Sequence, residues 1–404
     1  MPKLLQISIE VNSGSVGRIA EQIGETAMAN GWQSYITYAR NHLPSKSTTI
    51  RIGNMVDVYW HGVMTRLFDT HCLHSTLATR RLVKQIKEIA PDVILLHHIH
   101  GYFLNMKVLF EYLASIETPV VWVFHDCWSM TGHCVHFESA QCDRWKSGCY
   151  DCPQKGEYPA SALCDRSRKN YVEKRKLFTS VKNMTIVPVS NWLGNIVKES
   201  FLSKYNVEVI HNGIDISTFR PLQSNIKERY GISDKKVVLG VASPWSQQKG
   251  FDDFLKLYAH LPSNEFQIVM IGLSEQHQQR LPEGILGFGR TESVEELAKW
   301  YSAADVFFNP TYEDTYPTTN LEAISCGTPV VTYQTGGSPE SLTVKTGRVV
   351  EKRNIAGAVQ AIYNLCAKDR ETMRVCCRDY ALEHFDKRNC FERYMKLCEK
   401  IIKK

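Results

Sequence analysis

Short apolar runs alternate with amphipathic stretches along the whole chain. Runs such as Val93–His97 and Val120–Phe124 are apolar at nearly every position, and segments with helical spacing separate them. Strands that are apolar on both faces and separated by helices are typical of a parallel, doubly wound sheet. The pattern restarts at Val237 and ends in a helical segment, Arg388–Ile402. We therefore expect an α/β protein with two Rossmann-like units joined near residues 211–221.

The individual elements follow from this alternation. The expected strands are Leu4–Ile9, Gln33–Ala39, Val93–His97, Val120–Phe124, Thr185–Val189, Val207–Ile210, Val237–Val241, Phe266–Ile271, Ile285–Phe288, Val306–Asn309 and Val330–Tyr333. The expected helices are one ending near Gly31, Leu77–Ile89, Met106–Ile116, Asn170–Ser180, Trp192–Phe201, one from Phe251, Val294–Ala303, Pro317–Ser325, one from Ile355 and Arg388–Ile402. Because open parallel sheets bind ligands beyond the carboxyl ends of their strands, we expect the chemistry to gather there.

Composition narrows the class of protein. At 404 residues the chain exceeds what one core normally supports, and 43% hydrophobic and 22% charged residues are ordinary for a soluble globular protein. A net charge of +6 suits an anionic partner, but no basic arm, zinc-finger spacing or aromatic RNA-binding motif indicates nucleic acid.

The chain shows no sign of export or of membrane insertion. No run approaches the roughly 18–20 apolar residues that cross a bilayer. The first residues, MPKLLQISIE, reach Glu10 too soon for a signal peptide, so we expect a cytoplasmic protein. Thirteen cysteines in such a chain do not suggest a disulfide framework.

The stretch Pro310–Val331 contains the most informative spacing. Asp314 and Glu322 lie eight positions apart, with a proline-led helix start between them and Gly-Thr-Pro after them. A helix that opens at Pro317 would present its first free N–H groups to an anion. Asp314 would then lie just before the helix and Glu322 within it, and two carboxylates so placed would suit a polyhydroxyl group attached to a phosphate. The alternative is an ordinary amphipathic helix whose acids face water.

Lys249 is the second candidate. It follows a strand and a loop and stands with Gly250 at the opening of a helix. Its ammonium group would suit a diphosphate, and it would help most as negative charge grows on a leaving diphosphate. A solvated surface lysine is the alternative.

Two further segments lie at strand ends in the first half. Small residues in Gly14–Arg18 would let the backbone approach a ligand, although the same sequence fits a tight strand–helix turn. His125 ends the run VVWVFHD, where histidine serves either in a site or as a hydrogen-bonded structural group. The preceding strand ends in three more histidines that we expect in the same cleft, namely His97, His98 and His100.

These segments together resemble the retaining glycosyltransferases of family 4, which have two glutamates eight residues apart. Asp314 takes the first place and Glu322 the second, and the resemblance also covers HDCW at His125 and IHNGIDISTFRP at Ile210–Pro221. It implies a GT-B fold, in which two Rossmann-like domains face across a cleft, a nucleotide-sugar donor and retention of configuration. The motif Glu-Asp-x-aromatic-Pro resembles that of the family branch that builds capsular and other exported polysaccharides.

The resemblance also implies roles for residues. Glu322 would hold the nucleotide ribose, Asp314 the hydroxyls of the donor sugar, and His125 would face the reacting sugar. The implied catalytic residues are His125, Lys249 and Asp314, and the implied donor-binding residues are Gly14, Gly17, Arg18, Gly289, Arg290, Thr315, Tyr316, Pro317, Thr318 and Glu322. The family's arginine five residues before the lysine is replaced here by Pro244. Arg18 and Arg290 are candidates to replace its charge.

Retention suggests departure and attack on one face of the sugar, with the leaving phosphate taking the acceptor's proton. Metal-dependent transferases hold a divalent ion with an Asp-x-Asp triplet, which this chain lacks. We therefore expect catalysis that needs no cofactor and survives a chelator.

Four cysteines lie within 19 residues in TGHCVHFESAQCDRWKSGCYDCPQ. A CxxC pair with two further thiols is a candidate structural zinc site, with His133 and His136 as reserve ligands. The four are Cys134, Cys142, Cys149 and Cys152. Reduced buried cysteines or disulfides are the alternatives.

The sequence thus predicts three parts. Residues 1–207 would form an acceptor domain with a Cys-rich insertion at 126–165, residues 208–385 a donor domain, and residues 386–404 a helix packing back on the first. The predicted activity is transfer of a sugar to a lipid-linked glycan at the inner membrane face. The basic helix around Arg166–Lys176 would face anionic lipid, a pyrophosphate-linked acceptor or simply solvent. The alternatives are a sugar-nucleotide epimerase of the same fold and a non-catalytic nucleotide-sugar-binding protein.

Overall fold

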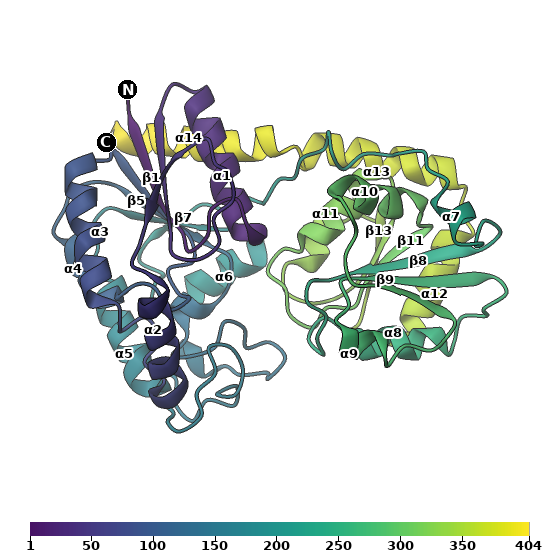
Figure 1. The fold of residues 1–404 in the computed structure, drawn as a ribbon, viewed down its shortest axis with the longest axis horizontal. Coiled ribbons are helices and arrows are strands. Elements are labelled where there is room, and N and C mark those ends of the chain that lie inside the picture. The colour runs from purple at the N-terminus through teal and green to yellow at the C-terminus, as the bar shows by residue number, and fades with distance from the viewer. Residues whose placement is uncertain (404) are drawn as a thin grey trace. The chain divides into compact units, whose positions relative to one another are not determined.

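The computed structural model describes residues 1–403, which form two compact units (Figure 1). The first contains residues 1–211 together with the chain from Phe391 onward, and the second contains Asn212–Cys390. Each unit has its own sheet, and all neighbouring strands in both sheets are parallel. The predicted α/β class with two doubly wound parallel sheets is confirmed.

The first sheet has seven strands in the order β3-β2-β1-β4-β5-β6-β7. They are β1 (Lys3–Ile7), β2 (Gln33–Tyr38), β3 (Thr48–Arg51), β4 (Val93–Leu96), β5 (Val120–Phe124), β6 (Met184–Pro188) and β7 (Asn206–Val207). Every residue of β4, β5 and β6 is buried, because helices cover both faces of the sheet.

The helices of the first unit flank this sheet (Figure 1). They are α1 (Gly14–Ala29), α2 (Met55–Phe68), α3 (Thr76–Ile89), α4 (Met106–Ala114), α5 (Ser167–Phe178) and α6 (Asn191–Glu199). The helices α3, α4 and α5 pack side by side, and α1 packs against β1 and β2. The last helix, α14 (Lys387–Ile402), joins the first unit through its later residues, where Arg393 Nη2 donates to Val209 O at 2.6 Å.

The second sheet has six strands in the order β10-β9-β8-β11-β12-β13. They are β8 (Lys236–Val241), β9 (Phe266–Ile271), β10 (Ile285–Phe288), β11 (Val306–Asn309), β12 (Val330–Tyr333) and β13 (Gly347–Val350). The accompanying helices are α7 (Ile226–Arg229), α8 (Phe251–Tyr258), α9 (Glu275–Gln278), α10 (Val294–Ala303), α11 (Thr318–Ser325), α12 (Ile355–Cys366) and α13 (Arg370–His384). The helices α8 and α9 lie on one side of the sheet, and α10, α11 and α13 lie on the other (Figure 1).

Each sheet has one point where the strand order reverses, between β1 and β4 in the first unit and between β8 and β11 in the second. Ligands of open α/β sheets bind at such a switch point, outside the carboxyl ends of the strands. The predicted chemistry falls there: Gly14 follows β1, His97 follows β4, Lys249 follows β8 and Asp314 follows β11.

The starting residues of two helices differ from the sequence-based expectation. Helix α11 begins at Thr318, and Pro317 stands before it as the extended N-cap residue. Helix α1 begins at Gly14, inside the segment expected to be a loop. Over residues 1–403, no helix is both long and apolar enough to span a bilayer.

Candidate active site

Lys249 and Asp314 form an ion pair at the carboxyl edge of the second sheet. Lys249 Nζ lies 2.7 Å from Asp314 Oδ2, although the residues are 65 positions apart in the chain. The pair is partly open to solvent, with 38% of the lysine and 18% of the aspartate side chain exposed. The sequence predicted both residues in one site, and the structure brings them into direct contact.

A close backbone approach produces this contact. Gly250 has φ +75°, and a Cβ atom there would lie 2.3 Å from Pro310 O. The backbone N–H of Tyr312 donates to Gln248 O at 2.7 Å, so the loop before α8 and the loop after β11 run together. Only glycine permits this conformation without a clash, which explains the Lys-Gly pair.

Asp314 is held in place from several sides. Its Oδ1 accepts the backbone N–H of Tyr316 at 3.1 Å, and its carbonyl oxygen accepts the N–H of Gly337 at 3.1 Å. The carboxylate therefore has a fixed orientation at the mouth of α11. Pro317 has no side-chain acceptor to cap the first N–H groups of this helix, and no acidic residue stands in its first turn. Such a helix terminus favours an anion.

Asn320 anchors the start of α11 to its surroundings. Its Oδ1 accepts from Asn309 Nδ2 at 2.8 Å, and its Nδ2 donates to Ser338 Oγ at 3.1 Å and to Ser341 Oγ at 2.9 Å. Asn320 is fully buried, and these bonds tie α11 to the end of β11 and to the 3₁₀ turn Ser338–Ser341. Sequence reasoning missed this residue, since an asparagine inside a helix gives no signal of its partners.

Glu322 lies on the second turn of α11 and meets a residue that the sequence did not suggest. Tyr301, on α10, donates its hydroxyl to Glu322 Oε2 at 2.9 Å. Burial raises the pKa of Tyr301 well above its ordinary value, and the charge of Glu322 raises it further, so the phenol remains a donor. The hydrogen bond orients the carboxylate, which makes Tyr301 a positioning residue.

The remaining predicted donor residues of this unit lie around the same sheet edge. Trp245, beside Pro244, is buried and donates Nε1–H to Ile271 O at 2.8 Å, so it anchors the loop after β8. Gly289 and Arg290 follow β10, the edge strand two positions from β8, and Arg290 is exposed. Thr315 and Tyr316 are buried beside Asp314.

In the first unit, His125 directly follows β5 and is linked to the sheet interior. Its Nε2 lies 3.2 Å from His97 Nδ1, and His97 Nε2 lies 3.0 Å from Gln6 Oε1. Because Gln6 Nε2 donates to Ala20 O at 2.8 Å, its Oε1 is the acceptor, and His97 must carry its proton on Nε2. His125 then donates from Nε2 to His97 Nδ1.

Both imidazoles are neutral near pH 7. Burial, and then the neighbouring His98, lower the pKa of His97 to about 3. Burial, then His98 and His97, lower the pKa of His125 well below its ordinary value. A neutral His125 suits hydrogen bonding to a sugar hydroxyl.

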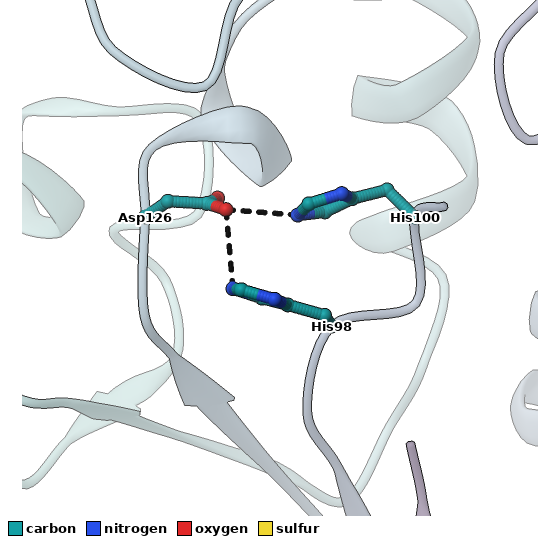
Figure 2. A group of neighbouring side chains, drawn as sticks. All are labelled: His98, His100 and Asp126. Carbon is teal, nitrogen blue, oxygen red and sulfur yellow. Dashed lines mark hydrogen bonds and ion pairs between the residues drawn. The ribbon is translucent and has the colours of Figure 1, made fainter. Parts of the chain in front are cut away.

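Asp126 holds two further histidines, as Figure 2 shows. Its Oδ2 accepts from His100 Nε2 at 2.8 Å and lies 3.2 Å from His98 Nε2, while Oδ1 accepts the N–H of Trp128 at 2.9 Å. Burial alone would raise the pKa of Asp126, but His100 and His98 hold it well below its usual value. The group is therefore a charged carboxylate with donors around it.

His98, His100 and Asp126 could also hold a metal ion, because one potential ligand atom of each lies within 4.8 Å of the other two. Within residues 1–403 no other group of three or more such residues meets this criterion. The sequence named the two histidines without a specific role and gave Asp126 none.

Gly14 and Gly17 occupy the first turn of α1, directly after the β1 loop, and Arg18 begins the second turn. Gly14 has φ +61°, and a Cβ atom there would lie 2.8 Å from Glu10 Oε2. Arg18 is exposed. These three residues and His125 belong to the first unit, and the other predicted catalytic and donor residues belong to the second.

Comparison with known proteins places this geometry in a family. Residues 16–218 match the family model described as Glycosyltransferase Family 4, and residues 235–368 match the model for group 1 glycosyl transferases. This chain belongs to glycosyltransferase family 4. It is a nucleotide-sugar-dependent glycosyltransferase, and the resemblance seen in the sequence is confirmed.

Individual relatives and solved structures agree with this family assignment. The chain is 22% identical to the putative colanic acid biosynthesis glycosyl transferase WcaC of Escherichia coli over 378 residues, covering 88% of this chain and 89% of that protein. The structure resembles sucrose-phosphate synthase from Thermosynechococcus elongatus with TM-score 0.73 at 14% identity, covering 99% of each chain. It resembles Anabaena HepE, solved with UDP and glucose, with TM-score 0.69 at 14% identity, covering 99% and 100%. The fold is therefore GT-B.

Proposed function

We propose that this family 4 enzyme transfers a sugar with retention from a nucleotide sugar to a lipid-linked glycan in cell-surface polysaccharide biosynthesis, without a divalent cation. The supporting observation is the Lys249–Asp314 pair, 2.7 Å apart beside the uncapped start of α11. A cation and a helix terminus at the same sheet edge form a site for a diphosphate, and a carboxylate beside them suits sugar hydroxyls.

In this proposal the donor lies along α11. Lys249 leaves Asp314 for the diphosphate, because two phosphate groups offer it more negative charge than one carboxylate. The released Asp314 accepts hydrogen bonds from hydroxyls of the donor sugar. Glu322, oriented by Tyr301, accepts hydrogen bonds from the ribose hydroxyls of the nucleotide.

The chemical step breaks the bond between the anomeric carbon and the leaving phosphate oxygen. The acceptor hydroxyl forms its new bond to that carbon on the same face, and its proton passes to the departing phosphate. Negative charge on the nucleoside diphosphate grows during this step, and Lys249 with the N–H groups of α11 stabilises it. His125, neutral and fixed by His97, hydrogen-bonds the reacting sugar.

Helix α2 supports the proposal that the acceptor is linked to a lipid. Four of its residues expose large apolar side chains to solvent: Val56 (76%), Tyr59 (70%), Trp60 (60%) and Val63 (50%). Spacings of three and four residues place them along one stripe of the helix, and aromatic residues of this kind favour the membrane–water interface. We propose that α2 lies on the inner face of the membrane and brings the enzyme to a lipid-linked acceptor.

The basic helix that the sequence suggested for this contact is less suitable. Lys174 on α5 is buried and donates to Trp128 O at 2.7 Å and to Thr131 O at 3.0 Å. Arg166 pairs with Glu173 at 2.9 Å. Lys174 is therefore used inside the protein, and the charge of Arg166 is paired with an acidic neighbour at the surface.

Names of relatives guide the choice of donor and pathway. WcaC is named for colanic acid biosynthesis, and HepE was solved with UDP and glucose. A relative from Mycolicibacterium smegmatis that is 29% identical over 219 residues is named as GDP-mannose-dependent. UDP-sugars and GDP-sugars are therefore the first donors to test.

Binding and turnover of two variants test the donor site. Screening nucleotide sugars by thermal shift should identify one that stabilises the protein. Glu322→Ala should weaken binding of this nucleotide sugar, while Lys249→Ala should slow turnover by about 100- to 1000-fold with a smaller effect on binding. Wild-type binding and turnover in both variants would contradict the assignment.

A further inference from the structure

His133 has one ring nitrogen that the protein leaves without a partner. Its side chain is fully buried, and Nδ1 lies 2.6 Å from Oδ1 of the equally buried Asp69. Its Nε2 is buried and has no hydrogen-bond partner within residues 1–403. A buried nitrogen without a hydrogen-bond partner destabilises the fold, which favours a bound group at this position.

Three thiols lie in the same segment as this imidazole. The Cys134 and Cys152 thiols are joined by a hydrogen bond, and Cys152 lies within electrostatic range of His133. Cys149 lies within the same range of Cys134 and Cys152, and its sulfur accepts the N–H of Gly132 at 3.1 Å. All three cysteines are free.

We propose that His133, Cys134, Cys149 and Cys152 bind one zinc ion. Three thiolates and one imidazole form a common tetrahedral set for structural zinc, and Cys149 and Cys152 have the CxxC spacing of such sites. Asp69 on Nδ1 fixes the imidazole so that Nε2 faces the metal, which is the arrangement of carboxylate–histidine–zinc sites. The Gly132 N–H stabilises charge on the Cys149 sulfur in the same way.

This ligand set differs from the one that the sequence suggested. His133, a reserve ligand there, takes the place of Cys142. The Cys-rich segment is not among the groups whose ligand atoms already lie within 4.8 Å of one another, so the thiols must turn inward when zinc binds.

The ion would add a further link between three parts of the first unit. Asp69 caps the end of α2, and its Oδ2 accepts the N–H of Arg166, next to the start of α5, at 2.7 Å. Zinc on His133 therefore links α2, the Cys-rich segment and α5. Trp128, which packs near His100 and donates to Asp126, lies five residues before His133. The zinc site is structural and positions these residues.

Metal analysis of the full-length protein, purified without metal-affinity resin, tests the site. We expect about one zinc per chain in the wild type, and loss of zinc in His133→Ala and Cys152→Ser. Cys142→Ser and Cys164→Ser are matched controls that should keep the metal, since Cys164 is an exposed cysteine of the same segment. Lys249→Ala should also keep zinc, so this result does not depend on the donor site.

A second measurement on the wild type avoids variants that fail to fold. Titration with a mercurial reagent should release zinc to an indicator dye as three thiols react, and cobalt substitution should give a thiolate charge-transfer band. A wild type without zinc, or a chain two hydrogens lighter through a Cys134–Cys152 disulfide, would overturn the proposal. Zinc retained in His133→Ala but lost in Cys142→Ser would overturn this ligand set.

Discussion

At the scale of single residues, the structure assigns partners that a sequence does not display. The spacing of Asp314 and Glu322 could be recognised because both lie within one short stretch. Tyr301 could not, since it stands on a different helix and acts only through its hydroxyl on Glu322. Asp126 was overlooked for a related reason. Its role depends on His98 and His100, which lie about 26 residues earlier in the chain and contact it only in the folded protein.

Buried neutral histidines give the molecule a defined response to acid. His61 is fully buried, its Nε2 accepts the N–H of Cys72 at 3.0 Å, and its Nδ1 meets Ser75 Oγ at 2.9 Å. Burial, then His74 and Arg40, lower the pKa of His61 to about 3. Between pH about 6.5 and 3, His61 therefore binds a proton in the unfolded chain but not in the folded chain.

We expect the free energy of unfolding to fall as pH drops from about 6.5 toward 3, and to be independent of this histidine above that range. Each such group contributes up to about 1.4 kcal/mol per pH unit to the slope. Urea denaturation at several pH values should show a shallower slope for His61→Gln. The exposed His260, changed to Gln, is the control and should leave the slope unchanged. An unaltered slope in His61→Gln would contradict the assignment.

At the scale of elements, burial decided what could be predicted. The strands β5, β9 and β12 were predicted to the residue, because they are apolar on both faces and are bounded by turn-forming residues. Strand β3 was missed because it is a short edge strand of sequence TTIR with little buried surface. Helix α2 was missed because it exposes apolar residues and buries His61 and Thr65, the reverse of the usual pattern.

The loop contact that forms the donor site can be tested at Gly250. Gly250→Ala would place a Cβ atom 2.3 Å from Pro310 O, and we expect a loss of about 1–3 kcal/mol of stability together with weaker donor binding. Gly231→Ala is a matched control, because Gly231 has φ +65° and a methyl group added there would meet nothing within 4 Å. Equal effects of both changes would show that backbone strain alone, and not the contact with Pro310, explains the loss.

The membrane role of α2 predicts a specific loss of lipid binding. The wild type should sediment with vesicles that contain anionic phospholipid, and Val56→Ser with Trp60→Ser should weaken this by about tenfold or more through lost apolar burial. Val172→Ser, on exposed α5 surface, should bind as the wild type does. Equal sedimentation of all three proteins would remove α2 from the proposed contact.

At the scale of the whole molecule, two parallel sheets place their chemistry at equivalent points. In the first unit the candidate residues follow β1, β4 and the adjacent β5, and in the second Lys249 and Asp314 follow β8 and β11, the two strands that flank the switch point. The sequence predicted doubly wound units and chemistry at strand ends. Strand order is a long-range property, so the contact of Lys249 with Asp314 needed the structure.

The requirement for magnesium tests the central claim most directly. Initial rates of sugar transfer should be measured in buffer freed of divalent ions by a chelating resin, with and without added Mg²⁺. This treatment avoids a strong chelator that could remove bound zinc. If Lys249 and the start of α11 neutralise the leaving diphosphate, both rates will be the same. Activity that appears only when Mg²⁺ is added would contradict this account.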